Sequence, residues 1–339
     1  MLNKAYIDLK ILQRNVKAIK KNLKKSTKFC AVVKADAYGH GAEKIASSIY
    51  NLCDCFAVAL VEEGISLRFS GIKKDILVLT PILSCDIDNA VFYNLTLSVE
   101  EMSLLKRIES ACKKQGRKAK IHLKFNTGMN RFGVDSLREL NSLAKFVFNS
   151  ECLILDGMFT HVGDFTNKNK LNIIQNKFLL ANNLIKGYNN NAICHVSASG
   201  GFLSGLGGDM VRIGILLYGY KPFNSSLVSV SPIMKICAPL IKTRQIKVGE
   251  NCLYGSLVLK EEVDVGLVRV GYADGFMREN VLGQVNNRCM DITAVKNPKL
   301  TKHGVLVMDN AEELAYQYDT ISYEILTKTA MRAEKIYLN

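Results

Sequence analysis

Short runs of β-favouring residues recur eight times before residue 220, and helical patterns separate most of them. The runs cover residues 28–37, 55–61, 75–80, 95–99, 118–124, 153–161, 192–197 and 211–217. The helical patterns cover residues 42–52, 100–114, 136–149 and 172–186. Alternation of strand and helix favours parallel strands joined by right-handed crossovers. Eight such units predict an α/β fold with a closed (β/α)8 barrel of the TIM type.

A second domain is predicted from the length of the chain and from a change in its pattern. A barrel takes about 250 residues, and the chain has 339. After about residue 225 the sequence has short β-like runs with little helical periodicity, at residues 233–241, 263–270 and 304–308. We predict a barrel over residues 1–225 and a mostly β domain over residues 226–339. Within the barrel, Asp8 is expected to cap a helix over residues 11–23.

The composition is that of a folded cytoplasmic protein. The chain is 48% hydrophobic and 22% charged, which is ordinary for a globular protein. Its ten cysteines show no zinc-like spacing, residues 1–4 do not resemble a secretory leader, and no apolar run is long enough to span a membrane. We therefore expect reduced thiols, a cytoplasmic location, no metal and no membrane partner.

The net charge of +14, from 45 Lys and Arg against 31 Asp and Glu, raises the possibility of nucleic-acid binding. Much of the excess lies in residues 17–25 and 113–118, which resemble solvated helix ends. Nucleic acid is therefore not expected as a partner.

Lys34 stands where an apolar, β-favouring run enters a turn of small residues and glycines, within residues 31–41. An ammonium at the end of a buried strand loses hydration, which lowers its pKa and makes the neutral amine available to a carbonyl or to pyridoxal phosphate. The alternative is a lysine whose head group reaches solvent. The position alone leaves both interpretations open.

Several polar residues fall at the carboxyl ends of predicted strands, where barrels have their active sites. They are Lys34, Arg131, His161, Ser199 and Arg212. Each has an ordinary structural explanation, as a surface ion pair, a buried histidine or a turn residue. Together they predict a site at one mouth of the barrel.

The surroundings of Lys34 resemble the cofactor-lysine motif of the alanine racemases, and the resemblance continues in order along nearly the whole chain. The matching segments are residues 124–131, 160–161, 212–214, 218–219, 254–255, 271–275, 289–291 and 323–326. The resemblance implies a pyridoxal-phosphate barrel followed by a β domain, with the first eight or so residues joining the carboxyl-terminal sheet.

The resemblance also implies how pyridoxal 5'-phosphate is held. Lys34 would bond to the cofactor, and Arg212 would face its pyridine nitrogen. A guanidinium stays protonated and cannot hand a proton to the ring, which favours return of the α-proton over transamination. The remaining cofactor-binding residues implied are Tyr38, His161, Ser199, Tyr323 and the backbone amides of Gly214 and Ile215.

Racemisation needs a base on each face of the substrate. The resemblance implies Lys34 and Tyr254, with Tyr254 supplied by the partner subunit of a homodimer. Arg131 would bind the substrate carboxylate, assisted by the Met290 amide of the partner, and Tyr272 together with Tyr254 would narrow the entrance so that a small side chain is favoured.

Lys124 corresponds to a lysine that is carbamylated in many family members. Asn126 stands where aspartate is often found, and two further departures are Ala198 in place of asparagine and Ala333 in place of valine. Fewer carboxylates near Arg131 leave two alternatives open, carbamylation of Lys124 or a bound anion.

The expected function is interconversion of L-alanine and D-alanine by two bases, supplying D-alanine for peptidoglycan. The alternatives are a broad-specificity racemase or a decarboxylase of the same fold, and a non-catalytic protein that binds pyridoxal phosphate.

Overall fold

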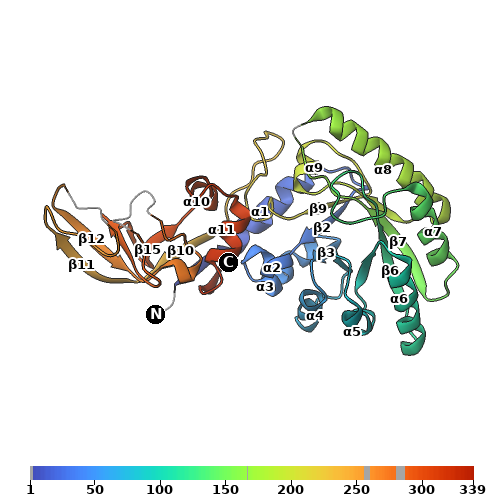
Figure 1. Cartoon of the computed structure of the whole chain (residues 1–339), viewed down its shortest axis with the longest axis horizontal. Helices are drawn as coiled ribbons and strands as arrows, with labels where there is room; N and C mark the ends of the chain where they lie inside the picture. The colour runs from blue at the N-terminus through green and yellow to red at the C-terminus, as the bar shows by residue number, and fades with distance from the viewer. Residues whose placement is uncertain (1–2, 166, 256–259, 280–286) are drawn as a thin grey trace.

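The protein has two parts that lie end to end, a barrel and a smaller part made mainly of sheets (Figure 1). The structure is a computed structural model that describes residues 3–165, 167–255, 260–279 and 287–339. No helix in these ranges is long and apolar enough to cross a membrane.

Eight parallel strands form the barrel, in the order β8-β7-β6-β5-β4-β3-β2-β9. Their bounds are β2 Lys28–Val32, β3 Cys55–Val58, β4 Ile76–Val78, β5 Thr96–Val99, β6 Ala119–Lys124, β7 Leu153–Phe159, β8 Ile193–His195 and β9 Met210–Ile213. Strands β8 and β9 stand at the two ends of this order, and isolated bridges link them. His195 of β8 bridges to Gly208, just before β9, and Arg212 of β9 bridges to Ala198, just after β8. The predicted (β/α)8 barrel is thus confirmed as a nearly closed one.

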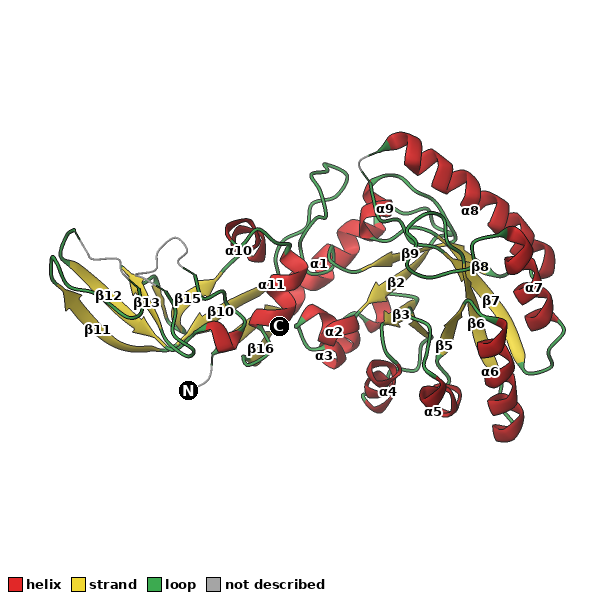
Figure 2. Ribbon diagram, viewed as in Figure 1, coloured by secondary structure: helices red, strands yellow, loops and turns green. Residues whose placement is uncertain are grey.

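Helices surround the barrel strands (Figure 2). They are α1 Leu9–Lys20, α2 Lys34–Tyr38, α3 Ala42–Ser48, α4 Val61–Phe69, α5 Ile87–Phe92, α6 Met102–Gln115, α7 Leu137–Phe148, α8 Lys168–Tyr188 and α9 Ser199–Leu203, with short 3-10 turns η1 Tyr50–Leu52 and η2 Ser84–Asp86. The predicted cap of α1 is confirmed, because the Ile11 amide donates to Asp8 Oδ1 at 2.8 Å. The predicted strand over residues 28–37 is wrong beyond Val32, where a turn begins.

The second part contains two antiparallel or mixed sheets and two short helices. The five-stranded sheet has the order β14-β15-β10-β1-β16, and the three-stranded sheet has the order β11-β12-β13. The bounds are β1 Lys4–Asp8, β10 Met234–Ala238, β11 Leu240–Ile246, β12 Val263–Val268, η3 Tyr272–Asp274, β13 Thr293–Lys296, β14 Leu300–Thr301, β15 Gly304–Met308, α10 Ala311–Gln317, α11 Ser322–Thr329 and β16 Glu334–Leu338. Strand β1 pairs antiparallel with β10 and parallel with β16, so the start of the described chain belongs to this sheet.

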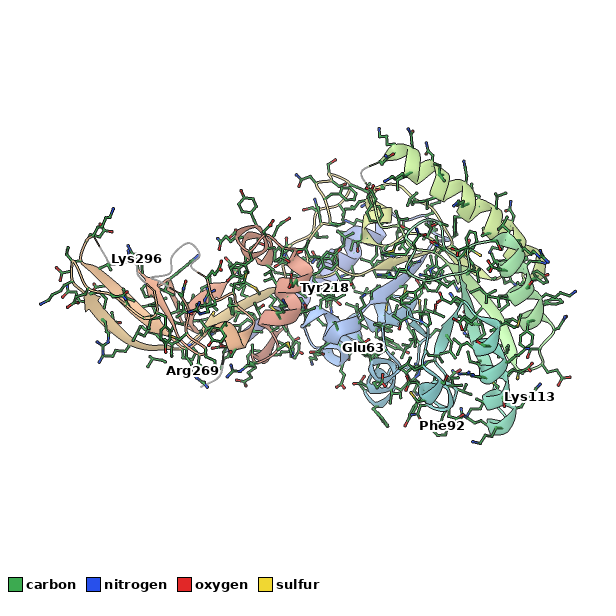
Figure 3. All side chains as sticks on the ribbon, viewed as in Figure 1. Glu63, Phe92, Lys113, Tyr218, Arg269 and Lys296 are labelled. Atoms are coloured by element: carbon green, nitrogen blue, oxygen red, sulfur yellow. The ribbon has the colours of Figure 1, made fainter. Side chains whose placement is uncertain are left out.

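One apolar core extends from the barrel into the five-stranded sheet, and the three-stranded sheet has a small core of its own. Tyr218 is fully buried and lies where the two parts meet (Figure 3). Its hydroxyl donates to the Val32 carbonyl at 2.9 Å, and its ring stacks on His40 with centroids 4.5 Å apart. The segment that carries Lys34 also contacts the second part of the molecule, because the Tyr337 hydroxyl donates to the His40 carbonyl at 3.1 Å.

Candidate active site

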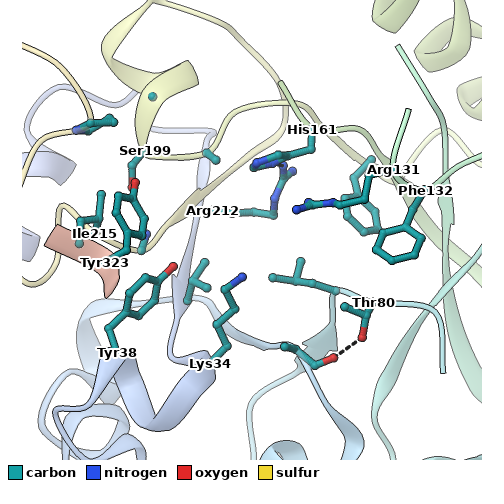
Figure 4. Close-up of a pocket in the computed structure, with 18 of the residues that line it drawn as sticks. Lys34, Tyr38, Thr80, Arg131, Phe132, His161, Ser199, Arg212, Ile215 and Tyr323 are labelled. Carbon is teal, nitrogen blue, oxygen red and sulfur yellow. Dashed lines mark hydrogen bonds between the residues drawn. The ribbon is translucent and has the colours of Figure 1, made fainter. Parts of the chain in front are cut away.

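A pocket of about 260 Å³ opens at the carboxyl ends of the barrel strands (Figure 4). It gathers most of the residues that the sequence predicted for the site: Lys34, Tyr38, Lys124, Arg131, His161, Ser199, Arg212, Gly214, Ile215 and Tyr323. Barrel elements supply all of these residues except Tyr323, which comes from α11 of the second part. The pocket therefore depends on both parts of the chain.

A left-handed turn directs Lys34 into this pocket. The four residues after it, Ala35 to Tyr38, have φ between 50° and 54°, a conformation that costs about 1–2 kcal/mol per residue for L-amino acids. Glu63 Oε1 accepts from the Ala35 amide at 2.5 Å. Asp36 accepts from the Ala42 amide at 2.8 Å and pairs with the Lys335 ammonium at 3.0 Å. These contacts come from α4, α3 and β16, so tertiary structure holds a turn that the local sequence disfavours.

Cations dominate the pocket lining. Lys34, Lys124, Arg131 and Arg212 all contribute to it, and among the described residues no carboxylate lines it. Burial and the nearby Arg131 charge lower the pKa of Lys34, and burial with the charges of Arg212 and Arg131 holds the pKa of Lys124 well below its ordinary value. An anionic ligand would neutralise this repulsion, so the pocket is suited to phosphate and carboxylate groups.

Arg212 is held in the pocket by neutral acceptors. It is 3% exposed, and burial lowers its pKa to about 10. Its Nη1 lies 2.5 Å from His195 Nδ1, and its Nη2 donates to the Thr160 carbonyl at 2.8 Å. Among the described residues it forms no ion pair, so its charge can act on a ligand.

Hydroxyl and amide groups gather at the opposite end of the pocket. Ser199 Oγ accepts from the Gly214 amide at 3.1 Å, and the rings of Tyr38 and Tyr323 lie 5.8 Å apart. Burial raises the pKa of Tyr323 to about 12, which keeps its hydroxyl a donor. A Cβ atom at Gly214 would lie 2.6 Å from the Tyr38 hydroxyl oxygen, so only glycine leaves this space open. Such a set of donors fits a phosphate group.

Three predicted residues lie away from this pocket. Tyr254, Tyr272 and Met290 belong to the second part and are 64%, 39% and 55% exposed. None of them lines the pocket that contains Lys34 in the same chain. The single chain thus supplies one side of the predicted two-base site.

Two residues that support the site were missed by sequence reasoning. Glu63 holds the left-handed turn after Lys34. The sequence feature that could have indicated Glu63 is its acidic side chain in the first turn of α4. His195 contacts Arg212 and was hidden inside the predicted strand 192–197.

The fold and the pocket define a class of protein, a (β/α)8 barrel with a strand-end lysine among anion-binding groups, followed by a mostly β domain. Residues 7–222 match the family described as alanine racemase, N-terminal domain, and residues 233–337 match alanine racemase, C-terminal domain. The chain belongs to the alanine racemase family, as the resemblance in its sequence predicted.

Relatives named alanine racemase are similar to this chain over 99–100% of its length. An alanine racemase of Streptococcus uberis is 31% identical over 99% of this chain and 97% of its own length. The structure of an alanine racemase from Clostridium difficile 630 is 29% identical, covers 100% of this chain and 96% of its own, and has a TM-score of 0.93. A Bacillus anthracis alanine racemase solved with bound L-Ala-P is 26% identical, with coverage of 99% and 95% and a TM-score of 0.89.

Proposed function

We propose that this protein interconverts L-alanine and D-alanine with pyridoxal 5'-phosphate bound at Lys34. The observation that carries the proposal is a lysine of lowered pKa in a pocket that no carboxylate lines among the described residues, in a chain of the alanine racemase family. We further propose that the reaction takes place in the cytoplasm and supplies D-alanine for peptidoglycan.

The residues at the two ends of the pocket suit the two ends of this cofactor. Tyr38, Ser199, Tyr323 and the Gly214 and Ile215 amides would hold the phosphate, and Arg212 and His161 would contact the ring. When bound, pyridoxal phosphate withdraws electrons from the substrate and so acidifies its α-proton. Because a guanidinium keeps its proton, Arg212 would donate a hydrogen bond to the ring nitrogen without protonating it.

Lys34 would act as the base on one face of the substrate. Its lowered pKa increases the fraction of neutral amine, which is the form that accepts a proton. Tyr254 would act on the other face from the partner subunit of a homodimer, and its 64% exposure in the single chain leaves it accessible to such a partner. Tyr272 and the Met290 amide would accompany it and restrict the entrance.

Arg131 would bind the substrate carboxylate. Lys124 would determine how much negative charge lies beside Arg131. Lys124 is 5% exposed, and its Nζ lies 3.7 Å from the centroid of the Phe159 ring. Its lowered pKa favours the neutral amine, the form that reacts with carbon dioxide to give a carbamate. Carbamylation or a bound anion would each place a negative charge beside Arg131.

Racemisation of alanine by the purified protein, followed by circular dichroism, tests this function. We expect the wild type to racemise alanine and to show the visible absorption of the bound cofactor, and we expect Lys34→Ala to lose both. A panel of other L-amino acids distinguishes an alanine racemase from a broad-specificity enzyme. A wild type that remains colourless and inactive after addition of the cofactor would refute the proposal.

A further inference from the structure

A row of hydrogen bonds leads from Arg212 across the interior of the barrel to a partly exposed carboxylate. His195 Nδ1 lies 2.5 Å from Arg212 Nη1, and His195 Nε2 lies 2.9 Å from His122 Nδ1. His122 Nε2 in turn lies 2.9 Å from Asp156 Oδ2. The two histidines are 0% and 2% exposed, so protein groups alone satisfy them.

Donor and acceptor chemistry gives this row a single direction. The ionised Asp156 carboxylate only accepts, so His122 must carry its proton on Nε2. His122 Nδ1 then accepts from His195 Nε2–H, which leaves His195 Nδ1 as a lone pair that accepts from Arg212. The opposite tautomer of His195 would put two N–H donors face to face at 2.5 Å.

The surroundings are built to keep this arrangement. Burial opposes ionisation of Asp156, but the hydrogen bond from His122 and the charges of Lys120 and Lys28 hold the pKa of Asp156 below its ordinary value. A Cβ atom at Gly157 would lie 2.6 Å from His122 Cε1, so the neighbouring position must be glycine for the ring to fit. Phe159 stacks on His195 with the ring planes 5° apart.

We propose that Asp156 and His122 are positioning residues that fix the tautomer of His195 and thereby hold the Arg212 guanidinium at the floor of the pocket. Asp156 lines a separate cavity of about 50 Å³ together with Asp75 and His122. Asp156 does not line the pocket that contains Lys34. The effect on catalysis rests on the proposed function, whereas the effect on the tautomer does not.

The test is nitrogen-15 NMR of the histidine rings in the purified holoenzyme, combined with steady-state kinetics. The chain has only five histidines, and a His195→Gln variant assigns the signal of His195. In the wild type we expect both His122 and His195 to be protonated on Nε2 alone. In Asp156→Asn we expect a second tautomer of His195, because an amide can donate as well as accept. We also expect kcat to fall about tenfold with little change in KM, as for the loss of one well-placed hydrogen bond.

Asp75→Asn is the matched control, since Asp75 lines the same cavity and pairs with Lys120 at 2.7 Å without contacting either histidine. It should change neither the tautomer nor kcat. Asp156→Glu, which restores a carboxylate, should recover the wild-type tautomer. A wild-type His195 protonated on Nδ1, or an Asp156→Asn variant whose His195 tautomer is unchanged, would overturn the proposal even if the protein did not racemise alanine.

Discussion

At the scale of single residues, Tyr254 is the group whose proposed role contrasts most with its position. It is 64% exposed on the second part of the chain, yet the proposed mechanism needs it opposite Lys34. A phenol in this role must lose its proton, which requires the cations of a neighbouring site. Arg131 and Arg212, which face that pocket, are the candidates to supply this charge.

The first prediction concerns the asymmetry of the two bases. Tyr254→Phe should slow removal of the α-proton from L-alanine by about a hundredfold or more, as expected for loss of a general base, while exchange from D-alanine by Lys34 continues. Proton NMR of deuterium uptake from each enantiomer in D2O measures both. Tyr316→Phe, at a residue 90% exposed, is the control. Equal losses for both enantiomers would remove Tyr254 from this role.

The second prediction concerns acid stability and His40. His40 is 0% exposed, its Nδ1 contacts the Ala37 and Tyr38 carbonyls at 2.9 and 3.0 Å, and burial lowers its pKa to about 4. The unfolded chain binds this proton below about pH 6.5, so between pH 6.5 and 4 the unfolded state holds more protons and stability falls as pH falls.

His40→Gln should therefore flatten the decline of unfolding free energy over this pH range, by at most about 1.4 kcal/mol per pH unit. Urea unfolding at a series of pH values measures it. The exposed His303 offers a control variant, His303→Gln, that should keep the wild-type slope. An unchanged slope in His40→Gln would contradict the assignment.

At the scale of elements, the left-handed turn after Lys34 depends on α4. Glu63 Oε1 accepts from the Ala35 amide, and its Oε2 accepts from the Ala59 and Leu60 amides at 2.7 and 3.0 Å. One carboxylate thus fastens the start of α4 to the turn that carries the lysine. Its charge also raises the pKa of Lys34, against the stronger effects of burial and Arg131.

The third prediction follows from that contact. Glu63→Gln puts an amide donor against backbone N–H groups, so we expect a loss of about 1–3 kcal/mol in unfolding free energy. Loss of the negative charge should also lower the pKa of Lys34 further. Urea unfolding and the pH dependence of Lys34 labelling by an aldehyde measure the two effects. Glu62→Gln, at the exposed neighbouring position, is the control and should change neither.

The barrel could be predicted from the sequence because each strand and helix carries its own periodic pattern. The turn at residues 34–38 could not, since Ala35, Asp36 and Ala37 contain no glycine and take a left-handed conformation only through Glu63 and Lys335. Helices α10 and α11 were missed for a similar reason, because they are short and lie among β-like runs. The pocket residues were predicted by a family resemblance more than by local pattern.

At the scale of the whole molecule, the chain presents a pocket with Lys34 in the barrel and exposed Tyr254, Tyr272 and Met290 on its second part. Two such chains related by a two-fold axis would form two equivalent sites, each completed by the other chain. A homodimer is therefore part of the proposed mechanism.

The fourth prediction tests sharing of the site. Lys34→Ala and Tyr254→Ala should each be inactive as homodimers. Co-expressed at equal levels, they should form heterodimers in which one of the two sites is intact, which gives about a quarter of wild-type activity for random pairing of a two-fold dimer. The activity of the co-expressed sample is compared with that of the two purified variants after mixing. Light scattering measures the mass of each sample and so verifies that dimers are present. No recovery in a verified heterodimer would show that both residues must come from one chain.

Strand β16 gives the lysine turn its support from the far end of the sequence. Lys335 pairs with Asp36, and the Tyr337 hydroxyl donates to the His40 carbonyl, 297 residues earlier in the chain, at 3.1 Å. Ribosomes add residues in order, and amino-terminal domains fold first during synthesis. These two contacts can therefore form only after β16 has been synthesised, so a chain that terminates upstream of residue 335 would leave the lysine turn without the Lys335 and Tyr337 contacts.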